Sequence, residues 1–148
     1  MESGFEAVWS RVTGGSVQDN ADATLDNWIR EEARGIRVYE TLLRSRLPDP
    51  VRKTFRQILN IKHRQLKQLQ VMVFLRTGDT IAVLNDDESA PASLPHGLRE
   101  RYRAEVEQAA RYRLFQTKQP DLTALSTQLA EEDERIAQRL RILMTGLF

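Results

Sequence analysis

The sequence predicts an all-α protein, a bundle of four long helices preceded by a short N-terminal helix. Apolar residues recur at every third or fourth position through most of the 148 residues, which is the spacing of one helical face. Short segments containing proline, glycine and acidic residues separate these stretches. No convincing alternation of apolar and polar residues indicates a strand. A chain of this length can bury one sizeable core without disulfides, and the sequence has no cysteine.

Residues 1–20 are predicted to form an amphipathic helix and a linker, and residues 21–148 the bundle. The apolar residues that share one face of this first helix are Phe5, Val8, Trp9 and Val12. Gly14 and Gly15 are expected to end it. A face this short is not stable alone, so either the chain's own bundle or a second copy should cover it. Because two-fold pairing is the commonest assembly, the sequence favours a homodimer.

The first two bundle helices are expected to form one hairpin. The first helix should begin at Asp22 or Thr24, which suit an N-cap, and run to about Arg46. Pro50 suits the first turn of the second helix, and Gly78 its end. The predicted core positions of this second helix are Val51, Phe55, Leu59, Leu66, Leu69 and Val73.

The other two helices are expected from Leu94 to about Lys118 and from Pro120 onward. Because the turn within each pair is short, each pair should be an antiparallel hairpin. The middle connection, residues 79–93, can reach about 50 Å, which exceeds the roughly 37 Å of a helix of about 25 residues. We therefore predict one long crossover, with the third helix starting at the same end of the bundle as the second.

Two carboxylates interrupt apolar helical faces, at matching places in the two halves of the chain. Glu32 lies within the stripe Leu25, Ile29, Glu32, Ile36, Tyr39 and Leu43, and Glu105 within the stripe Leu98, Tyr102, Glu105, Ala109, Tyr112 and Phe115. A buried carboxylate must be protonated, paired with a cation or bound to a metal. We therefore expect any functional site to include these two residues.

A shift of 73 residues lays the two halves over each other and suggests an internal duplication. The matched pairs include Glu32 with Glu105, Tyr39 with Tyr112, Leu25 with Leu98, Lys62 with Arg135, Asn60 with Asp133 and His63 with Ile136.

On these residues the chain resembles the ferritin-like superfamily, and in particular its rubrerythrin-like branch, over roughly residues 22–145. The resemblance rests on Glu followed seven positions later by Tyr on the first and third helices. In the family, the second and fourth helices carry Glu, two residues, His, directed at two metal ions. This chain has Asn60 with His63, and Asp133 with Ile136, at those positions.

The resemblance implies an eroded metal site, in which Glu32, His63, Glu105 and Asp133 hold one ion of iron, manganese or zinc. Ile136 cannot bind a metal, and Asn60 supplies no charge to bridge two ions. These two departures argue against a complete di-iron oxidase or peroxidase site, and the resemblance then implies a metal-handling or oxidoreductase-like protein.

A second interpretation needs no metal. Lys62 and Arg135 lie within one turn of the candidate ligands, so either could neutralise the carboxylates as an ion pair. The chain would then be a metal-free four-helix bundle that serves as an interaction or assembly module.

Charge and hydropathy limit the partners. The 22 basic and 21 acidic residues nearly cancel, and the basic ones are interleaved with acids, which argues against a nucleic-acid partner. No apolar run approaches the roughly 18 residues of a membrane span, and residues 1–15 lack the apolar run of a secretory signal. We therefore expect a cytoplasmic protein without a membrane partner.

Overall fold

Four helices make up nearly all of the described part of the chain: α1 (Ala7–Leu43), α2 (Asp49–Thr77), α3 (Leu94–Leu114) and α4 (Pro120–Leu147). The structure is a computed structural model that describes the backbone of residues 7–81, 91 and 93–147, and side chains in these ranges from residue 21 onward. No strand occurs among these residues, so the predicted all-α class is confirmed.

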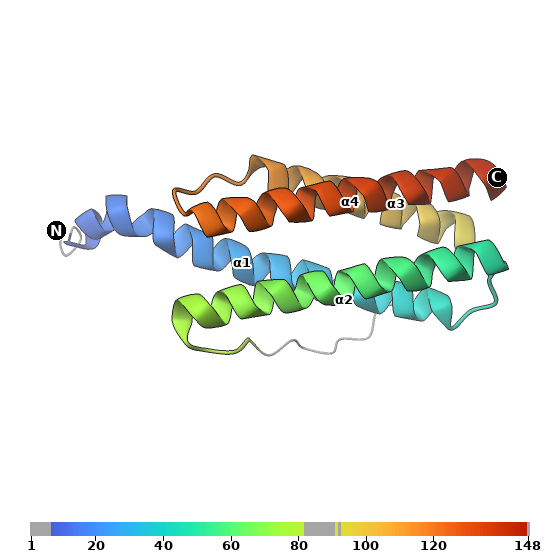
Figure 1. Cartoon of the computed structure of the whole chain (residues 1–148), viewed down its shortest axis with the longest axis horizontal. Coiled ribbons are helices and arrows are strands. Elements are labelled where there is room, and N and C mark those ends of the chain that lie inside the picture. Colours follow the sequence, from blue (N-terminus) through green and yellow to red (C-terminus); the bar gives the residue numbers. More distant parts are fainter. Residues whose placement is uncertain (1–6, 82–90, 92, 148) are drawn as a thin grey trace.

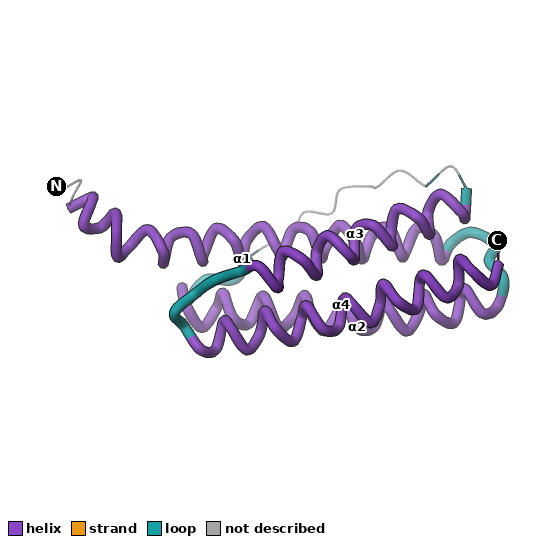
Figure 2. Tube along the Cα trace, turned by 90° about the horizontal axis from the view of Figure 1, so that it is seen from above, coloured by secondary structure: helices purple, strands orange, loops and turns teal. Residues whose placement is uncertain are grey.

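The four helices lie side by side as two hairpins, α1 with α2 and α3 with α4 (Figures 1 and 2). Each helix runs antiparallel to the neighbours on either side of it. At one end of the bundle Arg76 of α2 hydrogen-bonds to Asp22 of α1 and to Gln119. At the other end Gly97 of α3 lies against Leu42 of α1. Helices α2 and α3 therefore run in the same direction, and α3 begins at the end opposite to the end of α2.

Local signals account for most of the helix ends. Helix α2 has a proline in its first turn and stops at Gly78, whose φ of 77° is left-handed and whose N–H donates to Phe74 O at 2.8 Å. Ser93 caps α3 by accepting a hydrogen bond from His96 N at 3.3 Å. Helix α4 begins at Pro120, as predicted.

Helix α1 differs from the prediction. A short helix ending at Gly14 and Gly15, followed by a polar linker, was expected, but α1 is one helix of 37 residues that passes through both glycines. Each glycine costs about 1 kcal/mol of helix stability. Extending an existing helix needs no new nucleus, so two glycines need not break it. Phe5 lies outside the described residues, as do the side chains of Val8, Trp9 and Val12.

The N-terminal part of α1 projects beyond the end of the bundle (Figures 1 and 2). Near the end of α2, Arg76 still hydrogen-bonds to Asp22 of α1. We call residues 7–20 of α1 the α1 extension. None of the described helices is both long and apolar enough to cross a membrane.

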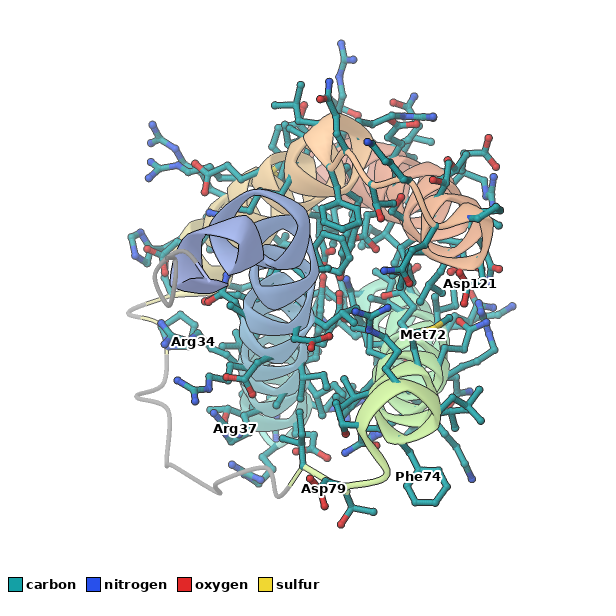
Figure 3. All side chains as sticks on the ribbon, turned by 90° about the vertical axis from the view of Figure 1, so that its left-hand side faces the viewer. Arg34, Arg37, Met72, Phe74, Asp79 and Asp121 are labelled. Atoms are coloured by element: carbon teal, nitrogen blue, oxygen red, sulfur yellow. The ribbon has the colours of Figure 1, made fainter. Side chains whose placement is uncertain are left out.

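The core of the bundle consists of two apolar clusters with a layer of charged side chains between them. One cluster lies toward the end from which the α1 extension projects and includes Leu25, Trp28, Ile29, Leu69, Tyr112 and Leu129. The other lies toward the opposite end and includes Tyr39, Phe55, Ile58, Leu98, Ile136 and Leu140. Viewed along the bundle, side chains fill the space between the helices (Figure 3).

Candidate functional site

A lysine, Lys62 of α2, lies at the centre of the charged layer. Its Nζ atom is 2.6 Å from Glu105 Oε1, 3.1 Å from Asp133 Oδ1 and 3.4 Å from Glu32 Oε1. The three carboxylates come from α3, α4 and α1, so one ammonium group joins all four helices. Each of these four side chains is at most 2% exposed. We call Lys62, Glu32, Glu105 and Asp133 the Lys62 cluster.

The periodicity of α2 places Lys62 inside. Its buried positions alternate steps of four and three and then end on a step of four: Val51, Phe55, Ile58, Lys62, Gln65, Leu69 and Val73. The predicted stripe used Leu59 and Leu66, which are only partly buried. Lys62 and Gln65 interrupt an apolar face, as Glu32 and Glu105 do, and this pattern was the signal that sequence reasoning missed.

Two tyrosines bind the cluster in a reciprocal way. Tyr39 of α1 donates a hydrogen bond of 2.7 Å to Glu105 of α3, and Tyr112 of α3 donates one of 2.6 Å to Glu32 of α1. Each hairpin therefore supplies the hydroxyl that binds the carboxylate of the other. The 73-residue shift matches Tyr39 with Tyr112 and Glu32 with Glu105, so the two hydrogen bonds are equivalent. Two structurally equivalent halves are expected to show this arrangement.

Further donors surround the cluster. Arg101 lies 2.9 Å from Glu105 Oε2, with its guanidinium 4.8 Å from the centre of the Tyr39 ring. Gly35 of α1 makes room for it, because a Cβ atom there would be 2.9 Å from Arg101 Nη2. Gln65 donates to Asp133 Oδ1 at 3.0 Å. The second oxygen of Asp133 is buried and has no hydrogen-bond partner among the described residues.

Burial and charge set the protonation states. Burial, then the neighbouring Glu105 and Glu32, raises the pKa of Asp133 to about 8, although Lys62 opposes the shift. Burial also raises the pKa of Glu32. For Glu105 the attraction of Lys62 and Arg101 outweighs burial and lowers the pKa. The cluster with Arg101 thus has two cations and three carboxyl groups, and one bound proton makes it neutral.

The donors keep their protons. Burial alone would lower the pKa of Lys62, but Glu105, Glu32 and Asp133 together raise it well above its ordinary value of 10.5. Burial and the neighbouring carboxylates raise the pKa of both Tyr39 and Tyr112. Lys62 is therefore an ammonium ion rather than an amine nucleophile, and both hydroxyl groups are committed as hydrogen-bond donors.

The structure brings together three of the four predicted site residues. Glu32, Glu105 and Asp133 meet in the bundle interior, as expected. The prediction for His63 was wrong, because its side chain is 53% exposed and its nearest acidic partner is Glu40 at 4.0 Å. Neighbouring residues on a helix point in different directions. Lys62 points into the bundle, so His63, the next residue, points toward solvent.

The structure also places the two residues that depart from the motif of the family that the sequence resembles. Asn60 is exposed, whereas Ile136 is 1% exposed and packs in an apolar cluster. Arg135, the other cation considered from the sequence, is exposed.

The residues present do not fit a metal ion. The space between the three carboxylates, where the sequence predicted the ion, is taken by the ammonium group of Lys62. In the described ranges no group of three or more His, Cys, Asp or Glu side chains is arranged to hold a metal. No histidine faces the cluster, and the lysine cation already compensates the carboxylates.

Comparisons of the chain with protein-family models, with curated proteins and with solved structures gave no match.

Proposed function

We propose that this chain is a metal-free bundle of ferritin-like architecture that serves as an assembly module and pairs as a homodimer. The observation that carries the metal-free half is the position of Lys62 Nζ, within 3.4 Å of three carboxylates from three other helices. An ammonium ion at this point supplies the positive charge that a metal would otherwise supply.

The ferritin-like part of the proposal is supported by the arrangement of the helices. Two antiparallel hairpins lie side by side with α2 and α3 in the same direction, and this arrangement requires a long connection between α2 and α3 (Figure 1). The reciprocal pairs, Tyr39 with Glu105 and Tyr112 with Glu32, support two related halves.

The cluster has a structural purpose in this proposal. Buried ion pairs add little net stability, because desolvation offsets most of the attraction. They do penalise wrong pairings, since any other register of α2 would bury Lys62 or the carboxylates without partners. The Lys62 cluster therefore specifies how the two hairpins meet. No catalytic role is assigned to it, because the ammonium group of Lys62 and the hydroxyl groups of Tyr39 and Tyr112 keep their protons and are all engaged with carboxylates.

Exposed apolar side chains on the surface of the bundle support the assembly part of the proposal. Several large apolar side chains are exposed, among them Leu75 at 72%, Leu114 at 78% and Phe74 at 49%. Figure 3 shows Phe74 pointing away from the bundle. The α1 extension projects past the end of the bundle formed by the other three helices (Figure 1).

Two measurements on the chain purified without chelator test this proposal. Elemental analysis should find far less than one equivalent of iron, manganese or zinc per chain, and the mass in solution should be that of a dimer. One firmly held equivalent of metal, whose removal by a chelator lowers the melting temperature, would overturn the metal-free half. A monomeric mass would overturn the assembly half.

A further inference from the structure

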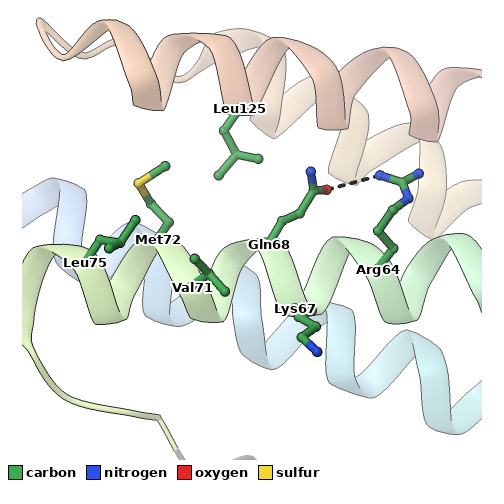
Figure 4. Close-up of a pocket in the computed structure, with 7 residues that line it drawn as sticks. All are labelled: Arg64, Lys67, Gln68, Val71, Met72, Leu75 and Leu125. Carbon is green, nitrogen blue, oxygen red and sulfur yellow. Dashed lines mark hydrogen bonds between the residues drawn. The ribbon is translucent and has the colours of Figure 1, made fainter.

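A groove on the outside of the bundle runs between α2 and α4, near the end from which the α1 extension projects. It has a volume of about 350 Å³ (Figure 4). The residues that line it are Arg64, Lys67, Gln68, Val71, Met72, Leu75 and Leu125. Its apolar part lies toward the end of α2, and its polar part lies deeper along the bundle.

The apolar part of the groove is open to solvent. Leu75 is 72% exposed and Val71 is 47% exposed, with Met72 and Leu125 forming the floor between the two helices. Exposed apolar side chains gathered at one concave site mark a surface that binds another apolar surface. The lining residues follow α2 from Arg64 to Leu75, and this arrangement suits a helix lying along the groove.

We propose that the α1 extension of a second copy of this chain occupies the groove, so that two copies exchange their α1 extensions. This inference rests on the homodimer proposed above and names its contact surface. It follows from three features that fit one another: the length of the extension, its sequence pattern and its charge.

The α1 extension matches the groove in length and position. Residues 7–20 of α1 form a helix of about 21 Å at 1.5 Å per residue, whereas Arg64 to Leu75 spans about 17 Å along α2. The extension leaves the bundle at the end where the apolar part of the groove opens. Two copies facing each other at this end can each insert an extension, which is the self-complementary contact of a two-fold dimer.

The sequence of the extension suits an apolar groove. Val8, Trp9 and Val12 have the spacing of one helical face, and Gly14 with Gly15 follows them. Each glycine costs about 1 kcal/mol of helix stability. A partner surface that covers the extension would offset this cost.

The charged residues indicate the direction in which the α1 extension lies in the groove. Acidic residues precede the apolar pattern, at Glu2 and Glu6, and the deep end of the groove carries the exposed Lys67. An extension that enters from the open end has its N-terminus deepest in the groove. Glu6 would then lie near Lys67, with the apolar positions beside Val71 and Leu75.

The first experiment measures dimer dissociation by analytical ultracentrifugation of the full chain and of exposed-residue variants. Leu75→Glu should weaken the dimer by about tenfold or more, since it places a charge in the apolar contact. Ile142→Glu is the matched control, because Ile142 is 61% exposed on α4 but does not line the groove, and it should have no effect. Circular dichroism checks that both variants fold.

Charge exchange tests the direction of the extension. Lys67→Glu and Glu6→Lys should each weaken the dimer about threefold to fivefold, and the double variant should restore it. Lys53→Glu, the same change on an exposed part of α2 outside the groove, should not be rescued by Glu6→Lys.

Because the chain has no cysteine, a disulfide can test the contact directly. Val8→Cys chains mixed with Val71→Cys chains should cross-link, whereas Val8→Cys with Ile142→Cys should not. A dimer that is insensitive to Leu75→Glu but lost on deletion of residues 1–15 would indicate that extensions pair with each other, and would overturn this inference alone. A monomeric wild-type chain would overturn it together with the proposed homodimer, while leaving the metal-free half standing.

Discussion

Lys62 Nζ lies 2.6 Å from Glu105 Oε1, the shortest of the three contacts that the ammonium group makes with buried carboxylates. This contact joins α2 to α3, the two helices that lie across the bundle from each other and run in the same direction. The same lysine reaches α1 and α4 through Glu32 and Asp133. Its removal should therefore affect the whole bundle.

We expect Lys62→Met to lower the free energy of unfolding by about 3–5 kcal/mol at pH 7, because it leaves buried carboxylates without their cation. Urea denaturation measures the change. The loss should shrink at pH 5, where the carboxyl groups are more readily protonated. Lys53→Met, at an exposed position of the same helix, is the control and should change stability by less than about 0.5 kcal/mol. Equal effects of the two substitutions would contradict the role given to Lys62.

A smaller side chain at position 62 should turn the cluster into a cation site. In Lys62→Ala the three carboxylates surround an empty space of the size of an ammonium group, and oxygen ligands suit Mn²⁺. Addition of Mn²⁺ should therefore raise the melting temperature of Lys62→Ala and leave that of the wild-type chain unchanged. A rise of similar size in both proteins would mean that Lys62 does not occupy the cation position.

The pH dependence of stability should reveal the proton on Asp133, whose pKa is raised from 3.8 to about 8, chiefly by burial. A carboxyl group with a higher pKa in the folded chain binds its proton more tightly there, so its protonation favours folding. The resulting stabilisation is complete below about pH 4, declines between pH 4 and 8, and is absent above about pH 8.

We expect Asp133→Asn to remove this contribution. Between pH 4 and 8 the stability of the wild-type chain should fall relative to the variant by up to about 1.4 kcal/mol per pH unit. Glu131→Gln, an exposed change on the same helix, should preserve the wild-type slope. Parallel stability curves for wild type and Asp133→Asn would exclude a bound proton at this residue.

Tyr39 and Tyr112 should contribute differently to stability although they occupy equivalent positions in the two hairpins. Tyr112→Phe removes the hydrogen bond to Glu32 Oε2 and should cost about 1–2 kcal/mol. Tyr39→Phe should cost less, because Arg101 still donates to the same oxygen of Glu105. Thermal unfolding of both variants, with Tyr102→Phe as the control outside the cluster, measures this order. A larger loss from Tyr39→Phe would mean that Arg101 does not compensate.

Glu32 and Glu105 could be predicted from the sequence because each interrupts an otherwise apolar helical face. Asp133 was predicted only from its place in the motif of the family that the sequence resembles. Lys62 interrupts the face of α2 in the same manner, but that face was predicted with Leu59 in place of Ile58. His63 was instead selected from its place in the family motif, and its side chain is exposed.

Some helix boundaries could also be predicted from the sequence, and others could not. Pro120 and Gly78 act through the backbone of their own turn, so the sequence alone identifies these ends. Gly14 and Gly15 were expected to break a helix, yet α1 continues through both. A glycine lowers helix stability without forbidding the conformation, so its effect depends on the neighbouring helix and on contacts that a sequence does not display.

We propose that a lysine ammonium ion, rather than a metal ion, neutralises the buried carboxylates. Nuclear magnetic resonance of the chain labelled with ¹⁵N-lysine measures this directly. We expect one ammonium signal with slow proton exchange, absent from Lys62→Met, unchanged by a chelator and not broadened by stoichiometric Mn²⁺. Absence of any protected ammonium signal, or selective broadening around Tyr39 and Tyr112 by one equivalent of Mn²⁺, would contradict the claim.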